Sequence, residues 1–505
     1  MIAIHSISDS QDLLDTNMIN TIHLVKNAMG GSPDLIVREI TLVSGWHAAV
    51  IYINGLVDLQ MIQSSILDSL LGFAKNGYNP YVHGSPLNYL KDNVLSVGDI
   101  GTIHKQGQLF PHLLCGDAIL LLNGYAEGLR IGVIGREERA VSEPTSQPSI
   151  RGPMDAFTES LQTNVSLIRR RIKDPQLWLE VHEIGKVTKT NVAIMYQQNI
   201  AEEHIVEEVR RRLSSIDIDG ILESGYIEEF IQEKKWTPFP TVYNSERPDT
   251  IAAGILEGRV AILIDGTPFV LLVPAFFIHF MQTPEDYYQR ADISTLIRII
   301  RYLSFFIVLL APSLYIAITT YHQEMLPTSL LLNLAGQREG VPFPAFIEAL
   351  MMEIVYEILR EAGIRMPRTV GQAVSIVGTL VIGQSAVEAG VISAVMVIIV
   401  SITAIASYVI PANAMSITVR MLRFILMGLA ASFGLFGILT GIILLGLHLN
   451  SLYSFGLPYM SPLAPFNLSD QKDTLFRISW PHMARRPSLL DHKNSHRMRG
   501  RKVKE

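Results

Sequence analysis

The spacing of apolar and polar residues divides the chain into two regions. Up to about residue 297, apolar residues occur in short runs and helical stripes that are separated by polar turns. Beyond about residue 302 they occur in long, nearly unbroken stretches. The pattern therefore predicts a soluble N-terminal region followed by a polytopic helical membrane domain.

The N-terminal region contains the same order of elements twice. Residues 49–53 and 118–122 have the composition of buried strands, and a helical stripe lies between them. Similar strands occur at 192–196 and 261–264, roughly 143 residues later, again with a helix between them. The stripes are Ile62, Ile66 and Leu70 in the first copy and Ile205, Val209 and Leu213 in the second. In each copy the second strand ends in a turn signal, Asn123-Gly124 or Asp265-Gly266. We therefore expect two tandem α/β cytoplasmic subdomains of similar topology.

The chain is predicted to have six parts, and a proline- and serine-rich linker joins the two subdomains. They are an N-terminal extension (1–33), a first α/β subdomain (34–141), the linker (142–149), a second α/β subdomain (150–297), a membrane domain (298–449) and a basic cytoplasmic tail (450–505).

The membrane domain is predicted to contain four spans, each of the roughly 20 residues that a bilayer requires. They are residues 302–320, 370–389, 391–410 and 422–447. Residues 343–358 differ because they carry Glu348, Glu353 and Glu357, and three carboxylates in one span are costly. We interpret this stretch as an amphipathic helix that lies at the interface or packs on other helices.

Composition and charge support this division. Hydrophobic residues make up 49% and charged residues 17%, whereas soluble proteins carry about 25% charged residues. The net charge of −6 gives no reason to expect nucleic acid as a partner. The start of the sequence lacks a secretory signal, and residues 472–505 hold ten Lys/Arg against three acids. By the positive-inside tendency both terminal regions should be cytoplasmic, which an even number of spans permits.

No motif points to an enzyme. The sequence has no phosphate-binding loop, nucleophile elbow or cysteine cluster, so we expect no catalytic residue, metal or cofactor. Cys115 is the only cysteine, which excludes an intrachain disulfide. The runs 169–171 and 210–212, each three arginines, are typical of solvated helix faces, with an acidic partner as the alternative.

The second predicted span has the composition of a functional helix. It is rich in small residues, and Val377, Val381, Gln384 and Glu388 fall on one helical stripe. Repeated around an oligomer axis, such a stripe would give valine constrictions that gate by dewetting, with polar and acidic rings that favour cations. The alternative is that Glu388 merely lies near the headgroups at the helix end. Helix packing is expected at four small residues: Ala386 and Gly390 in this span, and Gly437 and Gly441 in the fourth.

Several motifs resemble those of one known family. Residues 163–172 (TNVSLIRRRI), 284–288 (PEDYY) and 338–344 (REGVPFP) are similar to signatures of the A subunit of GerA-type spore germination receptors. Residues 370–389 and 410–412 look like the same family, and the resemblance covers about residues 35–487.

The resemblance implies a subunit of a nutrient receptor in the inner membrane of the endospore. Such A subunits are thought to assemble as a ring, proposed to be pentameric, that acts as a nutrient-gated ion channel. The implied partners are a transporter-like B subunit, which would be the main site of nutrient binding, and a lipoprotein C subunit. A non-conducting scaffold or signalling subunit remains an alternative, as does a related stage V sporulation membrane protein.

Overall fold

The computed structural model describes residues 12–42, 46–76, 85–135, 143–144, 146–367, 383–468, 470–486 and 496–498. The chain divides into two compact units. The α/β unit comprises Met1–Gln232, Val242–Pro274 and Met483–Glu505, and the helical unit comprises Glu233–Thr241 and Ala275–His482. Each unit is described by itself below.

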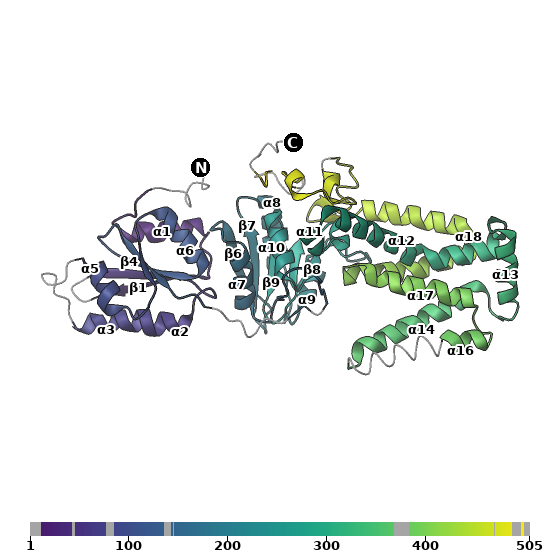
Figure 1. The fold of residues 1–505 in the computed structure, drawn as a ribbon, viewed down its shortest axis with the longest axis horizontal. Coiled ribbons are helices and arrows are strands. Elements are labelled where there is room, and N and C mark those ends of the chain that lie inside the picture. The colour runs from purple at the N-terminus through teal and green to yellow at the C-terminus, as the bar shows by residue number, and fades with distance from the viewer. Residues whose placement is uncertain are drawn as a thin grey trace. The chain divides into compact units, whose positions relative to one another are not determined.

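The first part of the α/β unit is a five-stranded antiparallel sheet with the strand order β1-β2-β4-β5-β3. Figure 1 labels β1 and β4 of this sheet, together with the helices α1, α3, α5 and α6. The strands are β1 (Leu35–Thr41), β2 (His47–Ile53), β3 (Ile100–Ile103), β4 (Asp117–Leu122) and β5 (Gly128–Gly132). The helices are α1 (Met18–Ala28), α2 (Leu59–Met61), the π-helical turn η3 (Ile62–Leu67), α3 (Asp68–Asn76), α5 (Pro86–Tyr89), η4 (Leu90–Val94) and α6 (Gln106–Cys115). One apolar cluster lies on each face of this sheet.

The second part of the α/β unit has a sheet of the same kind, with the order β6-β7-β9-β10-β8. Its strands are β6 (Leu177–Ile184), β7 (Thr190–Gln197), β8 (Tyr243–Ser245), β9 (Val260–Ile264) and β10 (Val270–Val273). The helices are α7 (Leu161–Arg171), α8 (Glu203–Ser214), α9 (Ser224–Ile231) and α10 (Pro248–Leu256). Every residue of β9 and β10 is buried.

The connectivity of the two sheets is the same. Numbered within its own copy, each sheet has the order 1-2-4-5-3, and each copy begins with a helix before its first strand. The strand predicted at residue 49 and the one predicted at residue 192 are β2 and β7, which occupy equivalent positions. The predicted helical stripes are buried in both copies.

The predicted domain boundaries differ from the structure at three places. Helix α1 contributes Met18, Ile22 and Val25 to the first core, so it belongs to the first subdomain and not to an extension. The second subdomain ends at Pro274, because residues from Ala275 onwards pack within the helical unit. The segment up to His482 also belongs to the helical unit, so residues 450–505 do not form one tail.

The helical unit consists mainly of long helices. They are η5 (Phe277–Met281), α11 (Glu285–Tyr288), α12 (Ala291–Tyr321), η6 (Gln323–Met325), α13 (Thr328–Arg338), α14 (Ala345–Arg365), α16 (Gly383–Glu388), α17 (Ala394–Val409) and α18 (Asn413–Asn450). A short hairpin of β11 (Tyr453–Ser454) and β12 (Leu457–Pro458) follows, with turns η8 (Asp470–Asp473) and η9 (Trp480–His482). Among the described residues, α12 and α18 are long and apolar enough to cross a membrane, whereas α17 is shorter.

Helix α18 is not one continuous span, contrary to the prediction for residues 422–447. Gly434 has non-helical angles (φ 59°, ψ −142°), and a side chain there would meet the His322 ring at 2.8 Å. Beyond it the chain doubles back, because a Cβ at Gly441 would lie 2.4 Å from the Leu426 side chain. Residues 413–433 and 435–450 are therefore two arms of a helical hairpin, the first about 31 Å long at 1.5 Å per residue.

Helix α14, which covers the predicted amphipathic stretch, packs on other helices. Near its start, the Glu348 carboxylate accepts hydrogen bonds from the Ser393 backbone and hydroxyl (3.1 and 2.9 Å), just before α17 begins. Near its end, the Arg360 guanidinium lies 4.8 Å from the Tyr408 ring centroid, near the end of α17. Helices α14 and α17 therefore run in parallel along one another.

Candidate functional site

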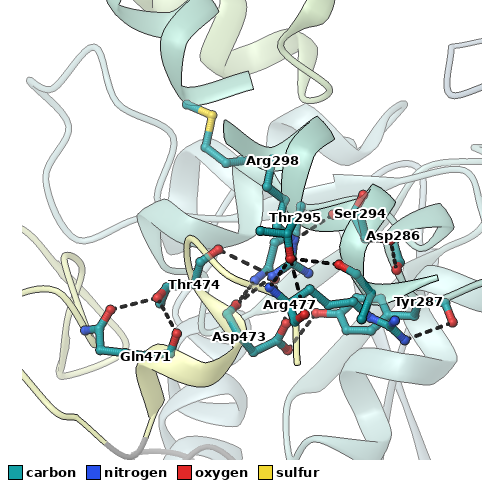
Figure 2. A network of polar contacts seen from close by, with 12 residues as sticks. Asp286, Tyr287, Ser294, Thr295, Arg298, Gln471, Asp473, Thr474 and Arg477 are labelled. Carbon is teal, nitrogen blue, oxygen red and sulfur yellow. Dashed lines mark hydrogen bonds and ion pairs between the residues drawn. The ribbon is translucent and has the colours of Figure 1, made fainter. Parts of the chain in front are cut away.

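A buried polar network joins the start of α12 to the segment that follows α18 (Figure 2). Its centre is Asp286 on α11, which is 2% exposed. The Asp286 carboxylate accepts hydrogen bonds from Arg298 Nε (3.0 Å) and Arg301 Nη1 (2.8 Å). Arg298 Nη1 also donates to the Asp473 carboxylate at 2.8 Å. Two carboxylates thus neutralise the two arginines that enter the first long apolar helix.

The C-terminal side of this network is held by further hydrogen bonds. The Tyr287 hydroxyl donates to Asp473 Oδ2 (2.8 Å), and the Arg477 backbone N–H donates to the Thr295 hydroxyl (3.1 Å). Arg477 Nη1 donates to the Gln289 carbonyl at 3.2 Å. Figure 2 shows these side chains converging from α11, α12 and residues 471–477. The network therefore clamps residues 470–482 onto the base of α12.

A second group of charges lies between the helices. Arg423 Nη2 on the first arm of α18 lies 2.5 Å from a Glu353 carboxylate oxygen on α14, and neither side chain has any exposed surface. Arg420 forms an ion pair with Glu357 one turn away. In the first turn of α14, a carboxylate oxygen of the buried Glu348 lies 3.5 Å from Arg338 Nε. Because an unpaired buried charge is expensive, these pairs fix how α14 packs on its neighbours.

The structure describes only part of the predicted pore stripe. Val377 and Val381 lie outside the described residues. Gln384 and Glu388 are both on α16, exposed, with Gln384 Nε2 donating to Glu388 Oε1 at 2.9 Å. The described half of the stripe thus presents an amide and a carboxylate on the outer face of this helix.

The predicted packing residues have different surroundings. Ala386 packs against the apolar cluster of the helical unit. Helix α16 ends at Glu388, and Gly390 follows in a left-handed turn (φ 66°) beside the Gly340 carbonyl, so the helical spacing does not extend to Gly390. A Cβ at Gly437 would lie 2.3 Å from the Leu429 carbonyl oxygen. Gly437 and Gly441 therefore permit close packing of the two arms of α18.

The sequence suggested that both arginine runs of the α/β unit lie on solvated helix faces. The structure shows this for only some of their residues. Arg169 is fully buried and forms a two-pronged pair with Asp34, with Nη2 at 2.9 Å, while its Nη1 donates to the Leu177 carbonyl. This pair ties α7 to the start of β1, and so joins the two subdomains. Arg211, in contrast, is exposed and pairs with Glu208 on its own helix.

Arg210 belongs to a polar cluster on the second sheet. Its guanidinium donates to both Glu180 carboxylate oxygens (2.9 and 2.7 Å) and to the Tyr196 hydroxyl (2.9 Å). Burial alone would raise the pKa of the Glu180 carboxyl, but hydrogen bonds from Arg210 and Tyr196 lower it below its usual value. Burial and the neighbouring carboxylate raise the pKa of Tyr196. Arg210, Glu180 and Tyr196 thus form a hydrogen-bonded ion pair, with His182 Nε2 3.9 Å from a Glu180 carboxylate oxygen. Across the described ranges, no three His, Cys, Asp or Glu side chains are arranged to hold a metal ion.

Sequence reasoning missed the two buried charge groups. It gave Arg298 and Arg301 no partner, and it treated Glu353 only as a costly charge in a membrane span. The available signal was the set of ionisable residues inside or next to apolar helices, including Arg420 and Arg423, because such residues normally have partners.

The chain is similar to several known proteins. The family model described as Bacillus/Clostridium GerA spore germination protein matches residues 23–489. Spore germination protein KA of Bacillus subtilis (strain 168) is 50% identical over 95% of this chain and 87% of its own length. Spore germination protein GerLA of Bacillus cereus is 37% identical over 95% of this chain and 97% of its own. A crystal structure of the N-terminal domain of the A subunit of the Bacillus megaterium spore germinant receptor GerK3 is 38% identical, with a TM-score of 0.42, covering 53% of this chain and 98% of that one.

The resemblance inferred from the three motifs is therefore confirmed. Two of those motifs supply central members of the buried groups, Arg169 in the α/β unit and Asp286 in the helical unit. The chain belongs to the GerA family of Bacillus/Clostridium spore germination proteins.

Proposed function

We propose that this germination receptor subunit forms an oligomeric, nutrient-gated ion channel in the inner membrane of the endospore. The observation that carries the proposal is the outer face of α16. Gln384 and Glu388 are exposed there, whereas the exposed residues of α12, α17 and α18 are mainly apolar. A polar face cannot be left against lipid at low cost, so it needs water or another subunit.

The outer faces of the long helices support a membrane setting. The exposed large side chains of α12 include Leu296, Leu303 and Phe306. Those of α18 include Ile425 (62% exposed) and Phe436 (72% exposed). Exposed apolar surface on this scale marks contact with a membrane or a partner, and helices of this length and composition fit the hydrocarbon.

The path of the chain supports an even number of crossings. Helix α12 starts beside Asp473, which follows α18, and it ends where Tyr321 donates to the Ala431 carbonyl (2.7 Å), beside the hairpin turn. Helices α14 and α17 run in parallel, so both end on the same side of the helical unit. The described candidates are α12, α14, α17 and the two arms of α18. Together with the span predicted from the sequence at residues 370–389, most of which lies outside the described residues, they give the six passes that we propose in place of the four predicted from hydropathy. Both terminal regions then stay on the cytoplasmic side, as the charge distribution predicts.

In this proposal copies of the chain meet around α16. Gln384 and Glu388 would form polar and acidic rings that attract cations, and Val381 would form the constriction that closes the path. The resemblance implies a pentamer together with a transporter-like B subunit and a lipoprotein C subunit. None of these roles requires a catalytic residue.

Conductance of the purified chain in planar bilayers tests the proposal. We expect cation currents from the wild-type protein and spontaneous opening in Val381→Ala, because a smaller side chain widens and wets the constriction. Val395→Ala on α17 is the control, since Val395 packs against the apolar cluster and should lose only packing. A properly assembled protein that conducts nothing, in either form, would favour a non-conducting scaffold subunit.

A further inference from the structure

The loop of residues 233–241 carries the most exposed tryptophan of the chain. Trp236 is 94% exposed, and Lys235 beside it is also exposed. Leaving a side chain this large in water forgoes the favourable free energy that burying its apolar ring would provide. An exposed aromatic of this kind, next to a lysine, is therefore a candidate contact surface.

The loop itself is firmly attached to the helical unit. Lys234 Nζ donates to the Ser451 carbonyl (3.0 Å) and hydroxyl (2.9 Å). The Thr237 hydroxyl lies 2.9 Å from His448 Nε2, and the Thr418 hydroxyl donates to the Pro238 carbonyl. The position of Trp236 is thus set by both arms of the α18 hairpin at the ends away from Gly434.

These attachment points mark the level at which the apolar outer surface begins. In the first arm, Ile417 and Met421 are exposed within one turn of the Thr418 contact. In the second arm, Leu444 and Leu447 are exposed within about one turn of the His448 contact. Trp236 therefore lies at the edge of the lipid-facing band on which the proposed function rests.

We propose that Trp236 is a bilayer anchor that inserts at the boundary between headgroups and acyl chains on the cytoplasmic side. Tryptophan favours this boundary because its ring is apolar while its indole N–H can reach polar groups. Lys235 places a positive charge beside lipid phosphates, and its long side chain can extend toward them. The anchor fixes the depth of the α18 hairpin in the membrane.

Tryptophan fluorescence of the full-length protein in lipid nanodiscs tests this anchor. Emission of the wild type minus that of Trp236→Phe isolates Trp236, and this conservative change at an exposed position leaves the fold intact. Lipids brominated near the headgroup should quench most of the Trp236 fluorescence obtained by this subtraction. Lipids brominated at mid-chain should quench less of it. A reporter, Phe306→Trp in the Trp236→Phe background, lies on the exposed face of α12.

The outcomes separate this inference from the proposed function. Quenching of Trp236 that is stronger with the shallow label supports the anchor. Quenching of the Phe306→Trp reporter without quenching of Trp236 overturns the anchor and leaves the membrane domain in place. Protection of Trp236 from aqueous acrylamide without quenching by either lipid shows a protein partner at this site, and also overturns it. Absence of lipid quenching at both positions contradicts the membrane setting itself.

Discussion

In the α/β unit apolar side chains fill the interior, whereas in the helical unit many of them face outward. Strand β4 is buried along its whole length, while Phe436 on α18 is 72% exposed. Both units bury charged side chains, Arg169 in the α/β unit and Glu353 with Arg423 between the helices of the other. The contrast is what the proposed membrane setting requires, because outward apolar side chains of the helical unit would then face lipid in place of water.

Buried arginines sharpen the comparison. Arg169 in the α/β unit has a two-pronged carboxylate partner and a backbone carbonyl. Arg423 in the helical unit depends mainly on Glu353, and its Nε and Nη1 atoms have no hydrogen-bond partner among the described residues. Loss of the main carboxylate partner should therefore lower the free energy of unfolding more in the helical unit than in the α/β unit.

The largest effect is expected for Glu353→Gln, which leaves the buried Arg423 with only the more distant Glu357 carboxylate, 3.6 Å away, as a countercharge. We expect the free energy of unfolding to fall by about 3–5 kcal/mol, measured by thermal unfolding of the detergent-solubilised protein. The matched change Asp34→Asn in the α/β unit should cost about 1–3 kcal/mol, because Arg169 keeps its carbonyl partner.

The exposed α14 pair of Glu361 with Arg365 provides the control for this experiment. Glu361→Gln should change stability by at most about 0.5 kcal/mol, as for other exposed helical pairs. A double variant, Glu353→Gln with Arg423→Gln, should regain part of the lost stability. If Glu353→Gln behaved like Glu361→Gln, the buried pair would not hold α14 in place.

A smaller effect is expected for Asp286→Asn, which weakens the clamp at the base of α12. Arg298 keeps Asp473, so we expect a loss of about 1.5–3 kcal/mol together with faster hydrogen exchange in residues 470–482. Asp292→Asn, at an exposed pair with Arg290, is the control. Unchanged exchange in residues 470–482 would show that the clamp does not depend on Asp286.

How much of this could be predicted depends on the range of the interactions involved. The duplicated sheets follow from local patterns, because the strands and the stripe of Ile205, Val209 and Leu213 are visible within short windows. The break at Gly434 is not visible, since a glycine inside an apolar run is equally compatible with a continuous helix. The Asp286–Arg298 and Glu353–Arg423 pairs join residues distant in sequence or on different helices, and no local pattern specifies such partners.

The smallest effect is expected on the surface of the α/β unit. Hydrogen bonds from Arg211 and Arg212 lower the pKa of Glu208 to about 2, from 4.5. Because the folded-state pKa is lower, the stabilisation is fully present above about pH 4.5 and is lost as the pH falls toward 2. Glu208→Gln should thus lower the unfolding temperature slightly near neutral pH, with a difference from wild type that narrows in acid. A difference that stayed constant down to about pH 3 would contradict this assignment.

The central claim is that the polar face of α16 lines an ion path, and the reversal potential in a salt gradient tests it most directly. Wild type, Glu388→Gln and the control Glu361→Gln would be compared in planar bilayers with unequal KCl on the two sides. We expect a cation-selective potential for wild type and Glu361→Gln, and a shift toward zero for Glu388→Gln, since the ring of carboxylates attracts cations. An unchanged reversal potential in Glu388→Gln, or the absence of current from the assembled wild-type protein, would contradict the account.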